Sequence, residues 1–277
     1  MIPRNHLYCG LIVVGLANGM SEKIVTSVTQ DGVTIALFHT FGVSVVVWIA
    51  GIVTLLLLWR AEVQPAGKLD FAVAAVASVA FLFPAPTLSW LAIAGIALFL
   101  GRSPKSSRAV CRAAALLGAL TVPMLWARIL FAAMSNYILA ADAKLVSLFV
   151  GTESNGNTIP FADGSGVLFL EPACSSLTNV SLALLCGVLF LKVYDRPWSA
   201  GIVRTIFIAC CVTVGINVLR IGSIGLFPAY YDLIHGPVGA TLSEWTMIIA
   251  VVGVYANGIK AAPRGVEGQT EIVAVER

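Results

Sequence analysis

Charged side chains are scarce in this sequence. Asp, Glu, Lys and Arg make up only 11% of its 277 residues, whereas about 25% of the residues of a soluble domain are charged. Hydrophobic residues make up 58%, which excludes an ordinary soluble globular protein and indicates a membrane protein. The net charge of +3 gives no indication of a nucleic acid partner, and we expect none.

The six cysteines include no C-x-x-C pair. A thiol oxidoreductase or a zinc site therefore has little support, and we expect neither a metal nor a cofactor. Cysteines inside apolar runs usually act as small hydrophobic residues. Only Cys174 lies at a predicted membrane surface on the side opposite the basic segments; the other five are Cys9, Cys111, Cys186, Cys210 and Cys211.

Long apolar runs recur along the chain, and several reach the roughly 20 residues that cross a bilayer core as a helix. The sequence predicts an all-α fold: a polytopic bundle of about eight transmembrane helices forming one membrane domain over residues 1–260. A polar cytoplasmic tail is expected over 261–277. The expected spans are 7–20, 35–59, 69–83, 87–100, 110–131, 178–194, 203–219 and 242–258.

Lysine and arginine predict the orientation of these spans. If the N-terminus is cytoplasmic, thirteen cations lie in cytoplasmic segments and three in external ones, a clear positive-inside bias. Arg128 lies within a span, near its outer end, where snorkelling explains it. The cytoplasmic set is Arg4, Arg60, Lys68, Arg102, Lys105, Arg108, Arg112, Lys192, Arg196, Arg204, Lys260, Arg264 and Arg277; the external set is Lys23, Lys144 and Arg220.

One long external segment, about 140–173, precedes Cys174. Its first part is predicted to form an amphipathic helix at the membrane interface. Turn signals at 155–157 and 163–166 flank two short apolar stretches, 158–161 and 167–170, which indicate a β-hairpin. This hairpin is either an ordinary surface loop or a cover over a site at Cys174.

Cys174, Arg220 and His235 are all predicted to reach the external face. A thiol with a pKa near 8.5 is only a few per cent ionised at neutral pH, but a helix N-terminus and a nearby imidazole favour the thiolate. The guanidinium of Arg220 could stabilise an oxyanion, and Asn217 could orient Arg220 from the same helix face. Taken singly, each has a simpler explanation: a structural thiol, a polar loop residue, and a helix-end anchor.

The chain resembles the exosortase/archaeosortase family in three ordered motifs. These are Ala173-Cys174-Ser175, Asn217-Val218-Leu219-Arg220-Ile221 and His235-Gly236. The family pattern has Gly after its Cys-Ser pair, where this chain has Ser176. The resemblance implies an exosortase-like cysteine peptidase or transpeptidase of the bacterial inner membrane, with its active site facing the periplasm. Cys174 would be the nucleophile, His235 the acid/base and Arg220 the transition-state stabiliser, with Asn217 and Ser175 in support.

The resemblance also implies a substrate class. Exosortase substrates are exported proteins with a C-terminal sorting signal: a short motif, often Pro-Glu-Pro, then a transmembrane helix and a basic tail. The enzyme would cleave near the motif and transfer the acyl group to an acceptor, which the sequence does not identify, commonly in an exopolysaccharide-producing envelope. Membrane lipid is the other expected partner.

Three other functions are open to this sequence. The main alternative is a non-enzymatic multi-pass membrane component of exopolysaccharide or envelope assembly. A transporter has less support, because the spans lack paired intramembrane carboxylates. An intramembrane serine protease has least, because Ser165 lies in a turn sequence.

Overall fold

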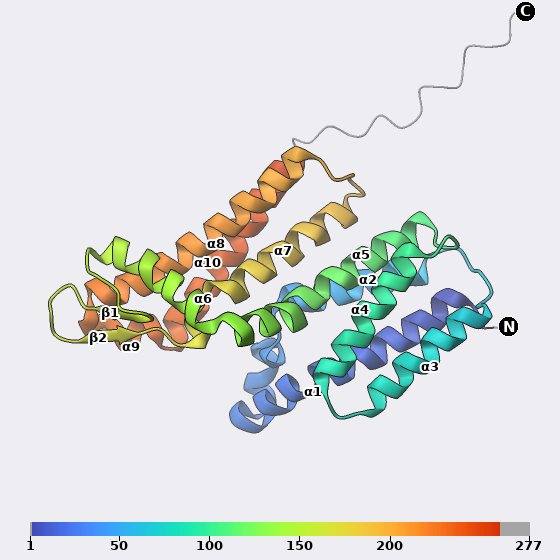
Figure 1. Ribbon diagram of the computed structural model, residues 1–277, viewed down its shortest axis with the longest axis horizontal. Helices are drawn as coiled ribbons and strands as arrows, with labels where there is room; N and C mark the ends of the chain where they lie inside the picture. Colours follow the sequence, from blue (N-terminus) through green and yellow to red (C-terminus); the bar gives the residue numbers. More distant parts are fainter. Residues whose placement is uncertain (1, 261–277) are drawn as a thin grey trace, which may run out of the picture.

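The computed structural model describes residues 2–260, and within this range the chain is helical almost throughout (Figure 1). The polar tail predicted for 261–277 lies outside the described residues. The main helices are α1 (Arg4–Phe38), α2 (Val45–Trp59), α3 (Lys68–Leu82), α4 (Pro86–Arg102), α5 (Arg108–Thr121), α6 (Ala127–Val150), α7 (Ser176–Val193), α8 (Ala200–Leu226), α9 (Tyr231–His235) and α10 (Pro237–Lys260).

The predicted all-α membrane bundle is confirmed, but the number of spans is not. Within residues 2–260, five helical stretches are long and apolar enough to cross a membrane, where eight were expected. Two further apolar helices, α2 and α4, have 15 and 17 residues, short of the roughly 20 that a bilayer core requires. The five are Arg4–Gln30, Arg108–Val150, Ser176–Val193, Ala200–Leu226 and Val238–Gly258.

Several of the expected boundaries are wrong. The expected span 35–59 is broken: the last part of α1, after a kink at Gly32, ends at Phe38, a turn occupies Thr40–Gly42 and α2 begins at Val45. His39 therefore ends α1 and does not lie inside a span. The helix expected after residue 140 is present as the last part of α6; it follows a kink at Met134, and α6 itself continues from α5 through a π-helical turn at Val122–Trp126.

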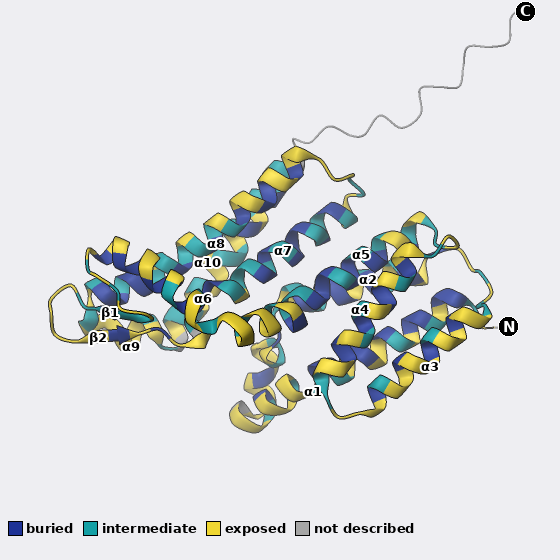
Figure 2. Cartoon of the chain, viewed as in Figure 1, coloured by how far each residue is buried: buried dark blue, intermediate teal, exposed yellow. Residues whose placement is uncertain are grey.

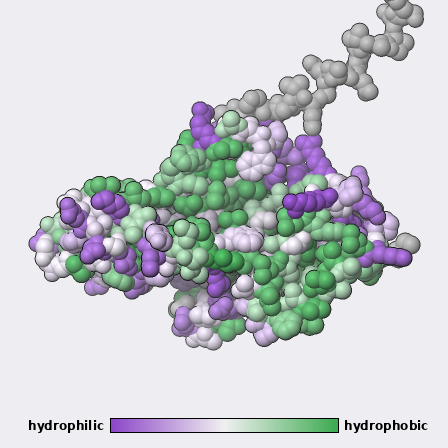
Figure 3. All heavy atoms as spheres, viewed as in Figure 1, coloured by the Kyte–Doolittle hydropathy of each residue, from purple (hydrophilic) through white to green (hydrophobic). Residues whose placement is uncertain are grey.

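The segments predicted to be cytoplasmic gather at one end of the bundle, here called the basic end. Arg4 donates to Asp70 Oδ1 at 2.7 Å and to Ser103 Oγ at 2.9 Å, which joins the starts of α1 and α3 to the α4–α5 connection. Arg112 lies 3.4 Å from Asp195 and so joins α5 to the α7–α8 connection. In Figure 3, apolar residues cover much of the bundle between this end and the opposite one.

The opposite end, here called the hairpin end, holds the predicted β-hairpin. Strands β1 (Thr158–Pro160) and β2 (Val167–Phe169) pair antiparallel, with Ile159 opposite Leu168. Both of these residues are buried in a small core with α6 and α8. Figure 2 shows buried positions in the hairpin beside exposed ones. Helices α6 and α8 cross so closely at Gly222 that a Cβ there would collide with Phe149. The hairpin is therefore packed on two helices rather than free on the surface.

The buried pair Arg4–Asp70 gives a stability prediction. Both side chains are 5% exposed, so Asp70→Ala should leave an uncompensated buried guanidinium and lower the free energy of unfolding by about 3–5 kcal/mol. Arg108→Ala is the control, since Arg108 is 62% exposed and its contact with Asp195 should contribute at most about 1 kcal/mol. Unfolding in mixed detergent micelles measures both variants; equal losses would contradict the argument.

Candidate active site at the hairpin end

Cys174, Arg220 and His235 line one cavity at the hairpin end. The cavity has a volume of about 60 Å³. The three side chains come from the segment before α7, from α8 and from α9, so residues up to 61 positions apart in sequence meet here. The rest of the wall is formed by Leu168, Phe169, Leu170, Glu171, Ile221, Ile224 and Tyr231.

Cys174 lies just before the N-terminus of α7. It ends a 3₁₀ turn, Pro172–Cys174, in which its N–H donates to the carbonyl of Glu171 at 2.9 Å. Ser175 is the N-cap of α7 and its Oγ accepts from the N–H of Leu177 at 3.2 Å. The thiol is free and half-buried, next to the N-terminus of α7.

Asn217 holds this turn in place. Its Nδ2 donates to the carbonyl of Cys174 at 2.8 Å and to Ser176 Oγ at 3.0 Å. The expectation that Asn217 orients Arg220 was therefore wrong, because its amide is used on the cysteine turn of α7. Ser176 accepts the second hydrogen bond, which a glycine at this position would have no side chain to do. Asp142 of α6 completes the anchorage by accepting from the N–H of Ser176 at 3.0 Å.

Arg220 is half-buried, and its Nε has no hydrogen-bond partner among the described residues. It was expected at the end of a helix, but α8 continues for six more residues to Leu226. The stabilisation of a cation by the helix dipole is confined to the last turn, so it does not explain why an arginine stands at position 220. A buried N–H without an acceptor costs about 1–3 kcal/mol, and an acceptor bound in the cavity would remove that cost. Arg220 is thus suited to hold an anionic or carbonyl oxygen.

His235 is the last residue of α9 and lies exposed at the cavity. Its ring stacks on Tyr231, one helical turn earlier, with centroids 5.0 Å apart and an interplanar angle of 10°. Gly236 follows, and a Cβ there would collide with the carbonyl of Asp232. The glycine of the His-Gly motif therefore lets the chain turn from α9 into α10 without moving His235.

The hairpin forms one wall of the cavity, since Leu168, Phe169 and Leu170 line it. Ala162 N–H donates to the carbonyl of Gly225 at 3.0 Å and so ties the hairpin loop to α8. At the exposed tip, the Oγ and N–H of Ser165 both donate to Asp163 Oδ1, at 2.6 and 2.9 Å, and lower the pKa of that carboxyl. Ser165 is thus used in the turn.

Sequence reasoning missed two residues of this site. Asp142 was taken as part of an interfacial helix, although a carboxylate in an apolar stretch is a reason to look for a buried partner. Tyr231 lies four residues before His235, the spacing that places two side chains on one helix face. Among the described residues, no group of three or more His, Cys, Asp and Glu side chains is placed to hold a metal ion.

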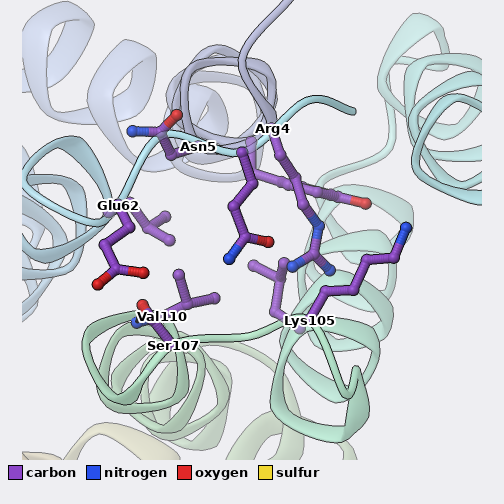
Figure 4. Close-up of a pocket in the computed structure, with 10 residues that line it drawn as sticks. Arg4, Asn5, Glu62, Lys105, Ser107 and Val110 are labelled. Atoms are coloured by element: carbon purple, nitrogen blue, oxygen red, sulfur yellow. Dashed lines mark hydrogen bonds between the residues drawn. The ribbon is translucent and has the colours of Figure 1, made fainter. Parts of the chain in front are cut away.

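A second, much smaller cavity lies at the basic end and has a volume of about 10 Å³, room for about one water molecule (Figure 4). Arg4 and Lys105 reach it opposite Glu62, and its ten lining residues include neither cysteine nor histidine. The guanidinium of Arg4 already donates to Asp70, Ser103 and Ser106. This cavity therefore lacks the groups needed for acyl chemistry.

The anchorage by Asn217 gives the second prediction. Asn217→Leu removes both donors and leaves the carbonyl of Cys174 unpaired, so the free energy of unfolding should fall by about 1–3 kcal/mol. Asn257→Leu is the matched control, because Asn257 is exposed and donates only to Gly253 of its own helix. Chemical unfolding in detergent compares the two variants, and the prediction is wrong if Asn217→Leu is as harmless as the control.

In comparisons with known proteins, no family model, curated protein or solved structure matches this chain.

Proposed function

We propose that this protein is a membrane cysteine peptidase or transpeptidase similar to exosortases. Its substrates would be exported proteins that carry a C-terminal motif, a transmembrane helix and a basic tail. The observation that carries the proposal is the shared cavity: a thiol, an imidazole and a guanidinium with an unpartnered Nε line the same space. These are the groups that nucleophilic attack, proton transfer and oxyanion binding require.

In the first half of the reaction, the Cys174 thiolate attacks the carbonyl carbon of the scissile peptide bond. A carbon–sulfur bond forms, and the carbonyl oxygen becomes an oxyanion that accepts hydrogen bonds from Arg220. The carbon–nitrogen bond then breaks as His235, protonated at the start, gives its proton to the leaving amine. The products are a thioester on Cys174 and the free amine of the released membrane tail.

In the second half, a nucleophile attacks the thioester carbonyl carbon. His235 accepts the proton of that nucleophile, the carbon–sulfur bond breaks and the Cys174 thiolate is restored beside an imidazolium. A water molecule gives hydrolysis, whereas a hydroxyl or amino group of an acceptor gives transfer. Both outcomes use the same residues, so the chemistry of the second nucleophile alone distinguishes a peptidase from a transpeptidase.

We further propose that the basic end faces the cytoplasm of a bacterium and that the cavity opens at the periplasmic face of the inner membrane. The positive-inside rule supports this orientation, because Arg4, Lys105, Arg108 and Arg112 gather at the end opposite Cys174. A substrate helix in the same orientation would place its basic tail at the cytoplasmic side. Its scissile bond would then emerge beside the cavity.

The nucleophile is tested with Cys174→Ala and Cys174→Ser. A periplasmic reporter fused to a C-terminal tail of this type from the same genome serves as substrate, and cleavage is followed by immunoblotting. Both variants should lower the cleavage rate by at least about a thousandfold, since each removes the reactive thiolate. Cys211→Ala, at an exposed cysteine of α8, should cleave normally. Normal cleavage by Cys174→Ala, with insertion confirmed, would exclude Cys174 as nucleophile.

Arg220 is tested by Arg220→Gln and Arg220→Lys in the same assay. Loss of one oxyanion donor lowers turnover by about 10²–10³-fold, and lysine should restore only part because it lacks the planar fork. Arg204→Gln changes an exposed arginine at the other end of α8 and should have little effect. Unimpaired cleavage in Arg220→Gln would favour the alternative that this protein is a non-enzymatic component of envelope assembly.

A further inference from the structure

Strand β2 has one paired edge and one open edge. Phe161 N–H donates to Gly166 O at 3.0 Å and Leu170 N–H to Asn157 O at 2.9 Å, so Gly166, Leu168 and Leu170 face β1. Backbone groups alternate along a strand, and Val167 and Phe169 therefore direct their N–H and C=O groups away from β1. Within residues 2–260, no hydrogen bond to these four groups is present.

The outer edge of β1, in contrast, is closed. Thr158 exchanges two hydrogen bonds with Asn155, at 2.9 and 3.1 Å, and Pro160 has no N–H to offer. The carbonyl of Pro160 accepts from Thr152 Oγ1 at 3.2 Å. Only one edge of this two-stranded sheet can therefore receive another strand.

The open edge borders the cavity that holds Cys174. Residues Leu168 to Glu171 line the cavity together with Cys174 and His235, so the edge is continuous with the candidate active site. The side chains of Val167 and Phe169 are each 61% exposed on the same face of β2. An unpaired edge flanked by exposed apolar side chains is the arrangement to which extended peptides add as a further strand.

We propose that an extended peptide binds as a third strand on the open edge of β2, hydrogen-bonded to the backbone of Val167 and Phe169. The inference rests on the proposed function in one respect: the peptide is taken to be the segment that presents the scissile bond to Cys174. In strand addition the hydrogen bonds are made to the peptide backbone, whatever its side chains. Selection among side chains would come from contacts with Val167, Phe169 and the cavity wall. The substrate class is thus an extended, unpaired segment rather than a helical one.

The test uses Val167→Pro and Phe169→Pro, which remove one outward N–H each and leave the bonds to β1 unchanged. The probe is acetyl-Ala-Val-Ala-Ala chloromethyl ketone, whose methylene carbon forms a bond to the Cys174 sulfur with loss of chloride. Mass spectrometry of the Cys174 peptide gives its second-order alkylation rate constant. Iodoacetamide, which has no peptide to dock, reports the reactivity of the thiol alone.

Each proline variant should slow alkylation by the peptide reagent about tenfold and change the iodoacetamide rate less than about twofold. Val167→Ala and Phe169→Ala keep the outward N–H groups. The rate of alkylation by the peptide reagent should therefore fall less in these variants than in the matched proline variants. N-methylation of alternate amides of the probe should slow its reaction with the unmodified protein. The methylated probe should then alkylate that protein and the proline variants at the same rate. Equal slowing of both reagents, or equal losses in Ala and Pro variants, would overturn the proposal.

Amide hydrogen exchange decides the question independently of thiol reactivity. In Cys174→Ala, acetyl-Ala-Val-Ala-Ala amide should slow exchange at Val167 and Phe169 while Leu168 and Leu170 stay protected. Unchanged exchange at Val167 and Phe169 at saturating peptide would overturn strand addition. Exchange at these residues that is already slowed in lipid nanodiscs without peptide would also overturn it, because the membrane would then cover the edge. Docking of the probe without cleavage of a fusion substrate would refute the proposed reaction and leave the docking edge in place.

Discussion

The start of α7 is the constraint on which the hairpin end depends. A helix begins with unpaired N–H groups, and a cysteine placed just before it is free to move unless neighbouring helices hold the turn. Here α8 supplies Asn217 for the carbonyl of Cys174 and for Ser176 Oγ, and α6 supplies Asp142 for the N–H of Ser176. Three helices thereby meet at a single turn, and their hydrogen bonds hold the wall of the cavity beside it in place.

The features that the sequence predicted correctly are those governed by local composition. Apolar runs indicated a helical membrane bundle, and turn residues on both sides of two short apolar stretches located the hairpin within a residue of β1 and β2. The charge bias placed Cys174, Arg220 and His235 at one end, and all three line one cavity there. The catalytic roles assigned to them rest on the resemblance and on the experiments above.

The features that the sequence did not predict depend on packing between distant segments. Hydropathy alone did not show that residues 35–38 are separate from α2, because the break at Thr40–Gly42 lies inside an apolar run. Spacing along α8 suggested that Asn217 orients Arg220, whereas the approach of α7 lets the Asn217 amide donate to the carbonyl of Cys174 and to Ser176 Oγ. The open edge of β2 likewise follows from the register of the pairing, which alternation of side chains leaves undetermined.

The ion pair of Arg4 has a consequence for the order in which the helices of the bundle can pack during synthesis. Its guanidinium joins residues 66, 99 and 102 positions further along the chain, so the first helix has no partners for its charge while it is being synthesised. At about 5–20 residues per second, the synthesis of these further residues takes about 3–20 s. The start of α1 therefore reaches its final packing only after α3 and the α4–α5 connection have been made.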